Sequence, residues 1–316
     1  LNNACPDIAE STIRSVLSYD DSDFSIDEDN ARKIIRALYG CKVLDPACGS
    51  GAFPVGVLQQ MVHILRKLDS TNEIWREFVL NIALEKDKQA YGVENEAEKS
   101  LMRQDIEQSF DKRINDPDYA RKLYLIENCI YGVDIQPIAI QICKLRFFIS
   151  LVAEQNPTAD ALHNFGIRPL PNLEAKFVAA NTLIPLDSND GLFASTTETL
   201  EIKKQLAAAS HKLFTVKRKA EKERLRDKID SLHKEYAQEL LSMGVLDTEN
   251  AMKFAKWDLF KQNEAAPFFT ARWMFDIETG FDIVIGNPPY ISAPAQIASK
   301  ELTEQRNKII ECKRYK

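Results

Sequence analysis

The 316-residue sequence lacks the marks of several large protein classes. None of its six cysteines belongs to a CxxC pair, so neither a disulfide framework nor a zinc site is expected, and reduced thiols in a cytoplasmic protein are the better interpretation. The four histidines stand apart from one another and from cysteine or acid clusters, which argues against a metal site. No apolar run approaches the roughly 20 residues that a membrane helix needs, and no signal peptide opens the chain.

The composition is that of an ordinary globular protein, with 45% hydrophobic and 28% charged residues. The formal net charge of −6 does not favour a stand-alone nucleic-acid binder, although phosphate binding requires only a local basic surface. The length suggests one large α/β domain with insertions, or two domains. The chain begins at Leu1 rather than Met and ends soon after a strong motif, so we expect it to be a piece of a larger protein.

Short apolar segments alternate with helical patterns along the chain. This alternation predicts a mainly parallel sheet with right-handed crossovers. The expected strands are 42–44, 129–133, 176–179 and 281–285, and the expected helices include 53–68 and 137–153. Two charged helical segments fit the pattern less well and are interpreted as insertions. The predicted division is therefore a first core part at 1–194 with an insertion at about 70–126, paired long helices at 195–260, and a second core part at 261–316.

The first motif follows the first predicted strand and leads into a helix. It contains only G-x-G and has Pro54 where the helix begins, so it is not the dinucleotide fingerprint. An acid at the strand end would repel phosphates but suits the ammonium group of a methionine moiety. We expect a ligand to approach the backbone here. The candidate cofactor-binding residues are Asp45, Pro46, Ala47, Cys48, Gly49, Gly51 and Phe53.

Two further strand ends carry candidate cofactor residues. Asp134 ends the second predicted strand, where a carboxylate can accept both hydroxyls of a ribose, and Ile135 would cover one face of an adenine ring. Glu94 is a competing acid, but its surroundings look solvated, so Asp134 is favoured. Asn181 follows the third strand and could offer a donor and an acceptor to a purine, although an Asn there is ordinarily a turn residue.

The most specific motif, Gly286-Asn287-Pro288-Pro289-Tyr290, follows the last predicted strand. Two prolines fix φ and leave carbonyls without neighbouring amide donors. If the Asn287 amide oxygen and the Pro288 carbonyl accept the two N–H groups of an aromatic amine, charge that develops on nitrogen is stabilised. Tyr290 offers a stacking face for a base. The motif predicts alkylation of an exocyclic amine, with Asn287, Pro288, Pro289 and Tyr290 as catalytic residues.

Together these motifs resemble those of the gamma-class amino-methyltransferases of restriction–modification and phage-defence systems, closest to the type IIG enzymes. The resemblance covers about residues 41–190 and 262–295, and its strongest parts are Asp45–Phe53, Tyr131–Ile135 and Asn287–Tyr290. It implies a Rossmann-like, S-adenosylmethionine-dependent methyltransferase fold, truncated at both ends. It also implies that Asn181 contacts the cofactor adenine, and that the substrate is adenine N6 in double-stranded DNA, with the base flipped out of the duplex.

The sequence departs from this family in two respects. A Tyr-Thr-Pro-like segment that normally precedes the cofactor motif is missing from residues 1–40. No target-recognition domain or endonuclease region is evident, so we expect these to belong to other regions of the same parent chain. By itself, the present chain is expected to be inactive or to bind weakly.

Two other functions stay open. A protein-glutamine N5 methyltransferase also uses an Asn-Pro-Pro-Tyr motif, because a side-chain amide is a similar acceptor. A helical DNA- or protein-interaction fragment with an inert fold is suggested by the basic segment 211–228, for which a solvated helix face is the simpler interpretation. Cytosine-C5 methylation is not expected, because the chain has no Pro-Cys dipeptide, and Cys48 is interpreted as a small packing residue.

Overall fold

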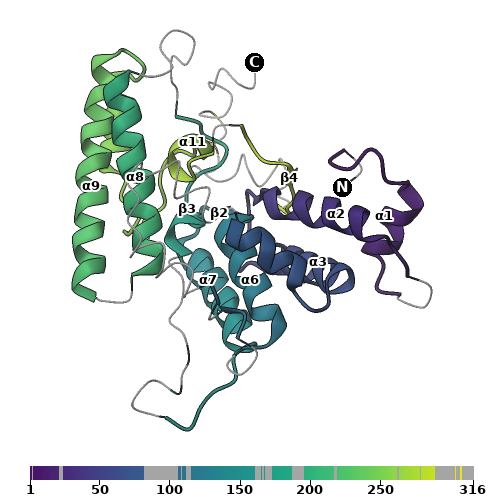
Figure 1. Ribbon diagram of the computed structural model, residues 1–316. Helices are drawn as coiled ribbons and strands as arrows, with labels where there is room; N and C mark the ends of the chain where they lie inside the picture. Colours follow the sequence, from purple (N-terminus) through teal and green to yellow (C-terminus); the bar gives the residue numbers. More distant parts are fainter. Residues whose placement is uncertain are drawn as a thin grey trace.

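The computed structural model describes the chain in segments. These are residues 1, 3–20, 24–81, 106–107, 109–111, 115–160, 165, 167, 173–186, 196–216, 219–261, 263–277, 279–288, 303 and 307. Within them, helices surround a small central sheet (Figure 1). No helix in these segments is both long and apolar enough to cross a membrane.

The sheet has four strands in the order β3-β2-β1-β4, and every neighbouring pair is parallel. The strands are β1 (Val43–Asp45), β2 (Ile130–Asp134), β3 (Phe177–Ala179) and β4 (Ile283–Val284). β3 and β4 lie within the predicted segments, whereas β1 and β2 each begin one residue later and end one residue later than predicted, at Asp45 and Asp134. The predicted α/β class with a parallel sheet is therefore confirmed.

Local sequence signals explain where the main helices begin. The helix α3 (Ala52–Leu68) follows Gly51, whose φ of 85° is the left-handed conformation that glycine adopts without steric cost. The helix α7 (Pro137–Val152) begins with a proline, which has no amide hydrogen to leave unsatisfied in the first turn. The helix α6 (Pro117–Asn128) starts the same way, and the Asp116 side chain caps it by accepting the Asp118 amide.

The two faces of the sheet belong to two separate hydrophobic cores, because alternate strand residues point to opposite sides. Ile130, Phe177 and Ala179 pack into the first core. This core includes residues of α3, α6 and α7 and of two N-terminal helices, α1 (Glu10–Leu17) and α2 (Glu28–Gly40).

On the second face, Leu44, Tyr131, Val133 and Val178 pack into a core built by the C-terminal helices. These helices are α8 (Thr197–Thr215), α9 (Lys219–Ser242), α10 (Thr248–Lys256) and the short α11 (Ala271–Met274). Figure 1 shows α8 and α9 side by side, on the opposite side of the sheet from α1 and α2. The long helices thus cover one face of the sheet. The domain boundaries at 194 and 260 stay a prediction.

The strand β4 lies at the edge of the described sheet and is poorly covered. Ile283 is 46% exposed and Val284 is 63% exposed. Its position is fixed from one side, since the Ile283 amide donates to the Lys42 carbonyl at 3.2 Å and the Ile285 amide donates to the Leu44 carbonyl at 2.9 Å. The segment that follows β4 therefore leaves the sheet next to the end of β1.

Candidate active site

The site lies where the chain order of the sheet reverses. From β1 the chain proceeds to β2 and β3 on one side, whereas β4 returns to the other side of β1. In open parallel sheets such a reversal opens a crevice outside the carboxyl ends of the strands, where ligands bind. The ends of β1 and β4 border this position, and Asp45 and Asn287 lie at or just beyond those ends.

The turn after β1 is held by the Asp45 carboxylate. Its Oδ1 atom accepts the Ala47 amide at 3.0 Å, and the side chain is almost entirely buried. Burial raises the pKa of Asp45 above its usual range, and the nearby charge of Asp134 raises it further. Gly49 and Gly51 follow with φ values of 52° and 85°, which turn the chain into α3. Asp45 thus supports the turn from inside rather than lying open to solvent.

Asp134 joins the same turn to the end of β2. Its Oδ2 atom accepts the Gly49 amide at 2.8 Å, and its Oδ1 atom accepts the Gln136 amide at 2.8 Å. The Cys48 amide also donates to the Val133 carbonyl at 2.9 Å. A carboxylate offers about four lone-pair sites, so these two bonds leave acceptor capacity for a ligand's hydroxyl groups. The competing acid, Glu94, lies outside the described residues.

Cys48 is a packing residue of the turn. Its side chain is buried, and a hydrogen bond with the Cys143 thiol, together with burial, raises the pKa of the Cys48 thiol. A thiol that stays protonated is a poor nucleophile. Space around this pair is tight: a Cβ atom at Gly51 would lie 2.6 Å from the Cys143 sulfur, and one at Gly132 would lie 3.0 Å from the Cys48 sulfur.

The segment after β3 is tied to the same turn by a residue that the sequence analysis missed. The Thr182 hydroxyl donates to the Pro46 carbonyl at 3.0 Å. Asn181 is partly buried, and its side-chain oxygen accepts the Leu183 amide at 3.1 Å. This is the turn geometry that an Asn after a strand ordinarily adopts, and no hydrogen bond within the described part of the chain occupies its side-chain nitrogen. The signal for Thr182 was its position at a strand's carboxyl end, next to Asn181.

The Gly286–Tyr290 motif begins in contact with the turn that follows β1. A Cβ atom at Gly286 would lie 2.8 Å from the Asp45 Oδ1 atom, so only glycine fits there without a shift. Asn287 and Pro288 come next and are exposed, whereas Pro289 and Tyr290 lie outside the described residues. Phe53 is 43% exposed and Ile135 is 47% exposed, which leaves both apolar side chains available to a ligand.

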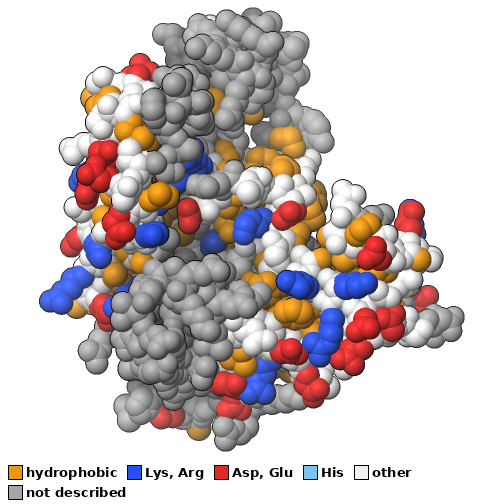
Figure 2. All heavy atoms as spheres, turned by 45° about the horizontal axis from the view of Figure 1, so that its top comes forward, with side chains coloured by type: hydrophobic (Ala, Val, Ile, Leu, Met, Phe, Trp, Pro, Cys, Tyr) orange, Lys and Arg blue, Asp and Glu red, His pale blue; other side chains and the backbone are white. Residues whose placement is uncertain are grey.

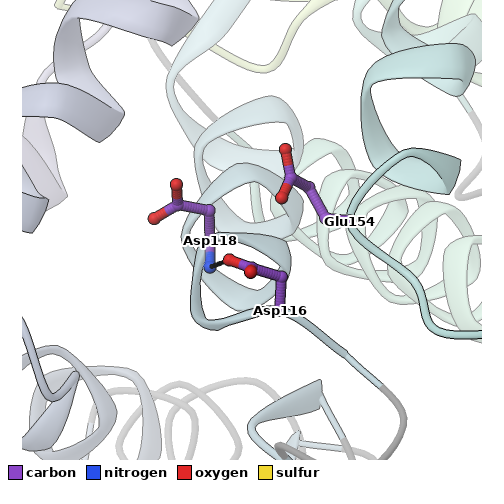
Figure 3. Close-up of side chains that lie close together, drawn as sticks. All are labelled: Asp116, Asp118 and Glu154. Atoms are coloured by element: carbon purple, nitrogen blue, oxygen red, sulfur yellow. Dashed lines mark hydrogen bonds between the residues drawn. The ribbon is translucent and has the colours of Figure 1, made fainter.

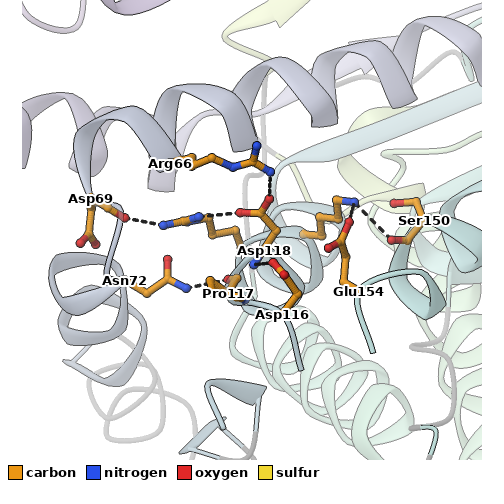
Figure 4. Close-up of polar contacts among 10 residues, drawn as sticks. Arg66, Asp69, Asn72, Asp116, Pro117, Asp118, Ser150 and Glu154 are labelled. Atoms are coloured by element: carbon orange, nitrogen blue, oxygen red, sulfur yellow. Dashed lines mark hydrogen bonds and ion pairs between the residues drawn. The ribbon is translucent and has the colours of Figure 1, made fainter. Parts of the chain in front are cut away.

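A separate group of acids lies away from this site. Asp116, Asp118 and Glu154 come within the spacing of a metal site (Figure 3). Figure 4 shows that the group is part of a network joining α3, α6 and α7. Arg66 lies near the C-terminal end of α3, whereas the turn after β1 leads into its N-terminal end. At a rise of 1.5 Å per residue, the two are about 20 Å apart along the helix.

Basic side chains already pair with two of these carboxylates. Arg121 is 1% exposed and pairs with Asp118 at 2.5 Å, Arg66 pairs with the same carboxylate, and Lys122 pairs with Glu154. Although burial alone would raise the pKa of Asp118, hydrogen bonds from Arg66 and Arg121 lower it below its usual range. The group is therefore an ion-pair network that stabilises the helices.

Comparison with known proteins gives two matches. The chain matches the family described as Eco57I restriction-modification methylase over residues 128–315, more than half of its length. A protein of Methanocaldococcus jannaschii, named as a type II restriction enzyme and methyltransferase, is 25% identical over 356 aligned residues. That alignment covers 95% of this chain and 26% of the relative, so the chain spans about a quarter of the relative's length. No solved structure matches the chain.

Proposed function

The chain belongs to the Eco57I restriction-modification methylase family, and on this premise we propose that it transfers a methyl group from S-adenosylmethionine to adenine N6 in DNA. The observation that carries the proposal is the contact between Gly286 and Asp45, because it joins the start of the Asn-Pro-Pro-Tyr motif to the turn proposed to hold the methyl donor. Donor and acceptor would then meet at one edge of the sheet.

The chemistry of the side chains at this edge fits S-adenosylmethionine. Two carboxylates, Asp45 and Asp134, provide a negative potential that suits a ligand with sulfonium and ammonium groups and disfavours a pyrophosphate. Asp134 would accept the ribose hydroxyls with its remaining lone pairs. Ile135 and Phe53 would contact the adenine ring with their exposed apolar surfaces, and Asn181 would bond its edge. When bound, the cofactor supplies an activated methyl group on sulfur.

The residues after β4 would then act on the amine. The Asn287 amide oxygen and the Pro288 carbonyl would each accept one of the two N–H groups. These acceptors stabilise positive charge that develops on nitrogen and turn its lone pair toward the donor. No strong base is needed, because the proton can leave after the methyl group is attached. Asn287 is exposed, and no hydrogen bond from the described residues occupies its amide.

Adenine in a duplex cannot reach such an edge, so we propose that the base is flipped out of the DNA. On the face seen in Figure 2, acidic and basic side chains are interspersed among the described residues without a broad basic surface. We therefore propose that further regions of a longer polypeptide, comparable to the rest of the relative's length, read the DNA sequence and hold the duplex.

Calorimetric titration of the chain with S-adenosylmethionine tests the donor site. We expect Asp134→Ala to abolish binding and Asn287→Ala to retain it, because only the first removes a proposed cofactor contact. Asp227→Ala removes an exposed acid on α9 and serves as the charge-matched control. Loss of binding in Asn287→Ala with retention in Asp134→Ala would contradict the assignment.

The acceptor is tested separately, with methyl-labelled S-adenosylmethionine and the longest polypeptide that contains this chain. We expect label in duplex DNA that contains adenine, and none in DNA whose adenines are already N6-methylated. Transfer to a glutamine-containing release-factor peptide instead would identify a protein-glutamine methyltransferase. Asn287→Ala should abolish transfer to either substrate.

A further inference from the structure

The helix α7 exposes an apolar stripe along its outer side. Ile138 is 65% exposed, Ile142 is 42% exposed, Leu145 is 53% exposed and Ile149 is 57% exposed. Their spacing of four, three and four residues keeps them within an arc of about 60° at 100° per residue. The opposite side of α7 is buried against β2, β3, α3 and α6. A helix that is apolar on both sides, with one side open, has a surface suited to a partner.

The spacing of the stripe indicates which kind of element would cover it. A 4-3-4 pattern is the seam of a heptad repeat, and such a seam packs against the apolar side of another α-helix. An amphipathic helix lying along α7 would bury all four side chains together.

The charges beside the stripe define this helix further. The α7 sequence, Pro137–Val152, contains no acidic residue. Arg146 lies on one flank of the stripe and is exposed, and no ion pair with an acid of the described segments involves it. An amphipathic helix with acidic residues beside its apolar side would complement this flank.

A second copy of the chain fits the surface less well. Four half-exposed side chains on one helix form a narrow surface, which suits a single docked helix better than a whole second subunit. Pairing two copies along α7 would also bring both Arg146 side chains into one interface without an acid from either helix. We propose that α7 is a docking surface for an amphipathic helix with acidic flanks. This surface is independent of the proposed reaction, because its four residues lie outside the candidate active site.

Fluorescence anisotropy with a labelled synthetic peptide tests this proposal on the intact chain. The probe is a three-heptad helix with Leu at the seam and Glu on both flanks, and its matched control carries Lys in place of every Glu. We expect the acidic peptide to bind at least tenfold more tightly than the basic one. Leu145→Glu should weaken binding at least tenfold, whereas Met252→Glu, at a residue of α10 that is 52% exposed, should leave it unchanged.

Charge reversal provides a second readout that a folding defect would not mimic. Arg146→Glu should lower the affinity for the acidic peptide and raise it for the basic one. The proposal is overturned if the acidic peptide fails to bind at chain concentrations up to about 100 µM, a range in which micromolar complexes form. It is also overturned if both peptides bind equally, or if light scattering shows a dimer of the chain that Leu145→Glu dissociates.

Discussion

Gly132 in the middle of β2 provides a stringent test of the packing beneath the candidate active site. A Cβ atom at this position would lie 2.7 Å from Phe177 Cδ1 and 3.0 Å from Cys48 Sγ, whereas carbon atoms pack best at about 3.5–4.0 Å. Phe177 is fully buried and packs against Phe147 with ring centroids 4.7 Å apart, so its ring cannot move freely. Gly132→Ala therefore overpacks the first core.

Overpacking of this kind costs about 1–3 kcal/mol, and two contacts on buried groups favour the upper half of that range. For a chain of 316 residues, with an unfolding entropy of about 2.1 cal/mol/K per residue, this loss corresponds to a fall of about 3–5 °C in Tm. The measurement is urea and thermal denaturation, with Gly56→Ala as the matched control. A Cβ atom at Gly56 meets nothing within 4 Å, and its helical position predicts a gain of about 0.5–1 kcal/mol.

A double variant separates overpacking from a general intolerance of β2 to substitution. Phe177→Leu removes the ring edge that the new methyl group would strike, so Gly132→Ala should cost at least 0.5 kcal/mol less in that background, at about the lower limit for coupled neighbours. Additive losses, or a Gly132→Ala variant as stable as the parent, would refute the packing argument.

Two further predictions concern buried charge. Burial lowers the pKa of His233 to about 4, and the ring stacks on Trp257 at 5.3 Å. Between pH 6.5 and 4 the unfolded chain binds a proton that the folded chain excludes. The free energy of unfolding should therefore fall by about 3 kcal/mol as the pH falls through this window. In urea titrations at pH 7 and pH 4, His233→Phe should show a pH dependence that is smaller by this amount. Equal pH dependence in both proteins would disprove this assignment. Arg121→Met leaves the buried Asp118 carboxylate without one of its two basic partners, and it should lower the free energy of unfolding by about 3 kcal/mol. The control, Arg14→Met, breaks an exposed pair with Glu10 and should change the free energy of unfolding by less than about 1 kcal/mol. Equal effects of the two arginine substitutions would show that the network contributes little.

Most of the local geometry of the candidate site could be predicted from the sequence. An acid after a short apolar segment, followed by Gly49 and Gly51, indicates a turn into a helix, and both glycines have positive φ. Pro137 indicates the start of α7 in the same way. These predictions succeed because steric limits on φ and the demands of helix ends act within a few residues of the chain.

Other features depended on residues far apart in the sequence. Thr182 reaches Pro46 across 136 positions, and the Lys42 amide donates to the Asp282 side chain across 240. The long connection after β3 could place β4 either beside β1 or beyond β3. The choice depends on how whole layers of helices bury their apolar sides, and no short sequence pattern encodes it. The exposure of β4 and of the α7 stripe has the same origin.

The sequence by itself determined the parallel α/β architecture and the acids and turns at the ends of the strands, because these follow from short-range sterics and periodicity. Only the tertiary structure decided that β4 lies next to β1, so that Gly286 contacts Asp45 and Asn287 emerges beside the turn that follows β1. It also decided that Asp45 is buried while Asp134 remains partly open. The physical reason is that strand order and burial depend on the packing of all layers together.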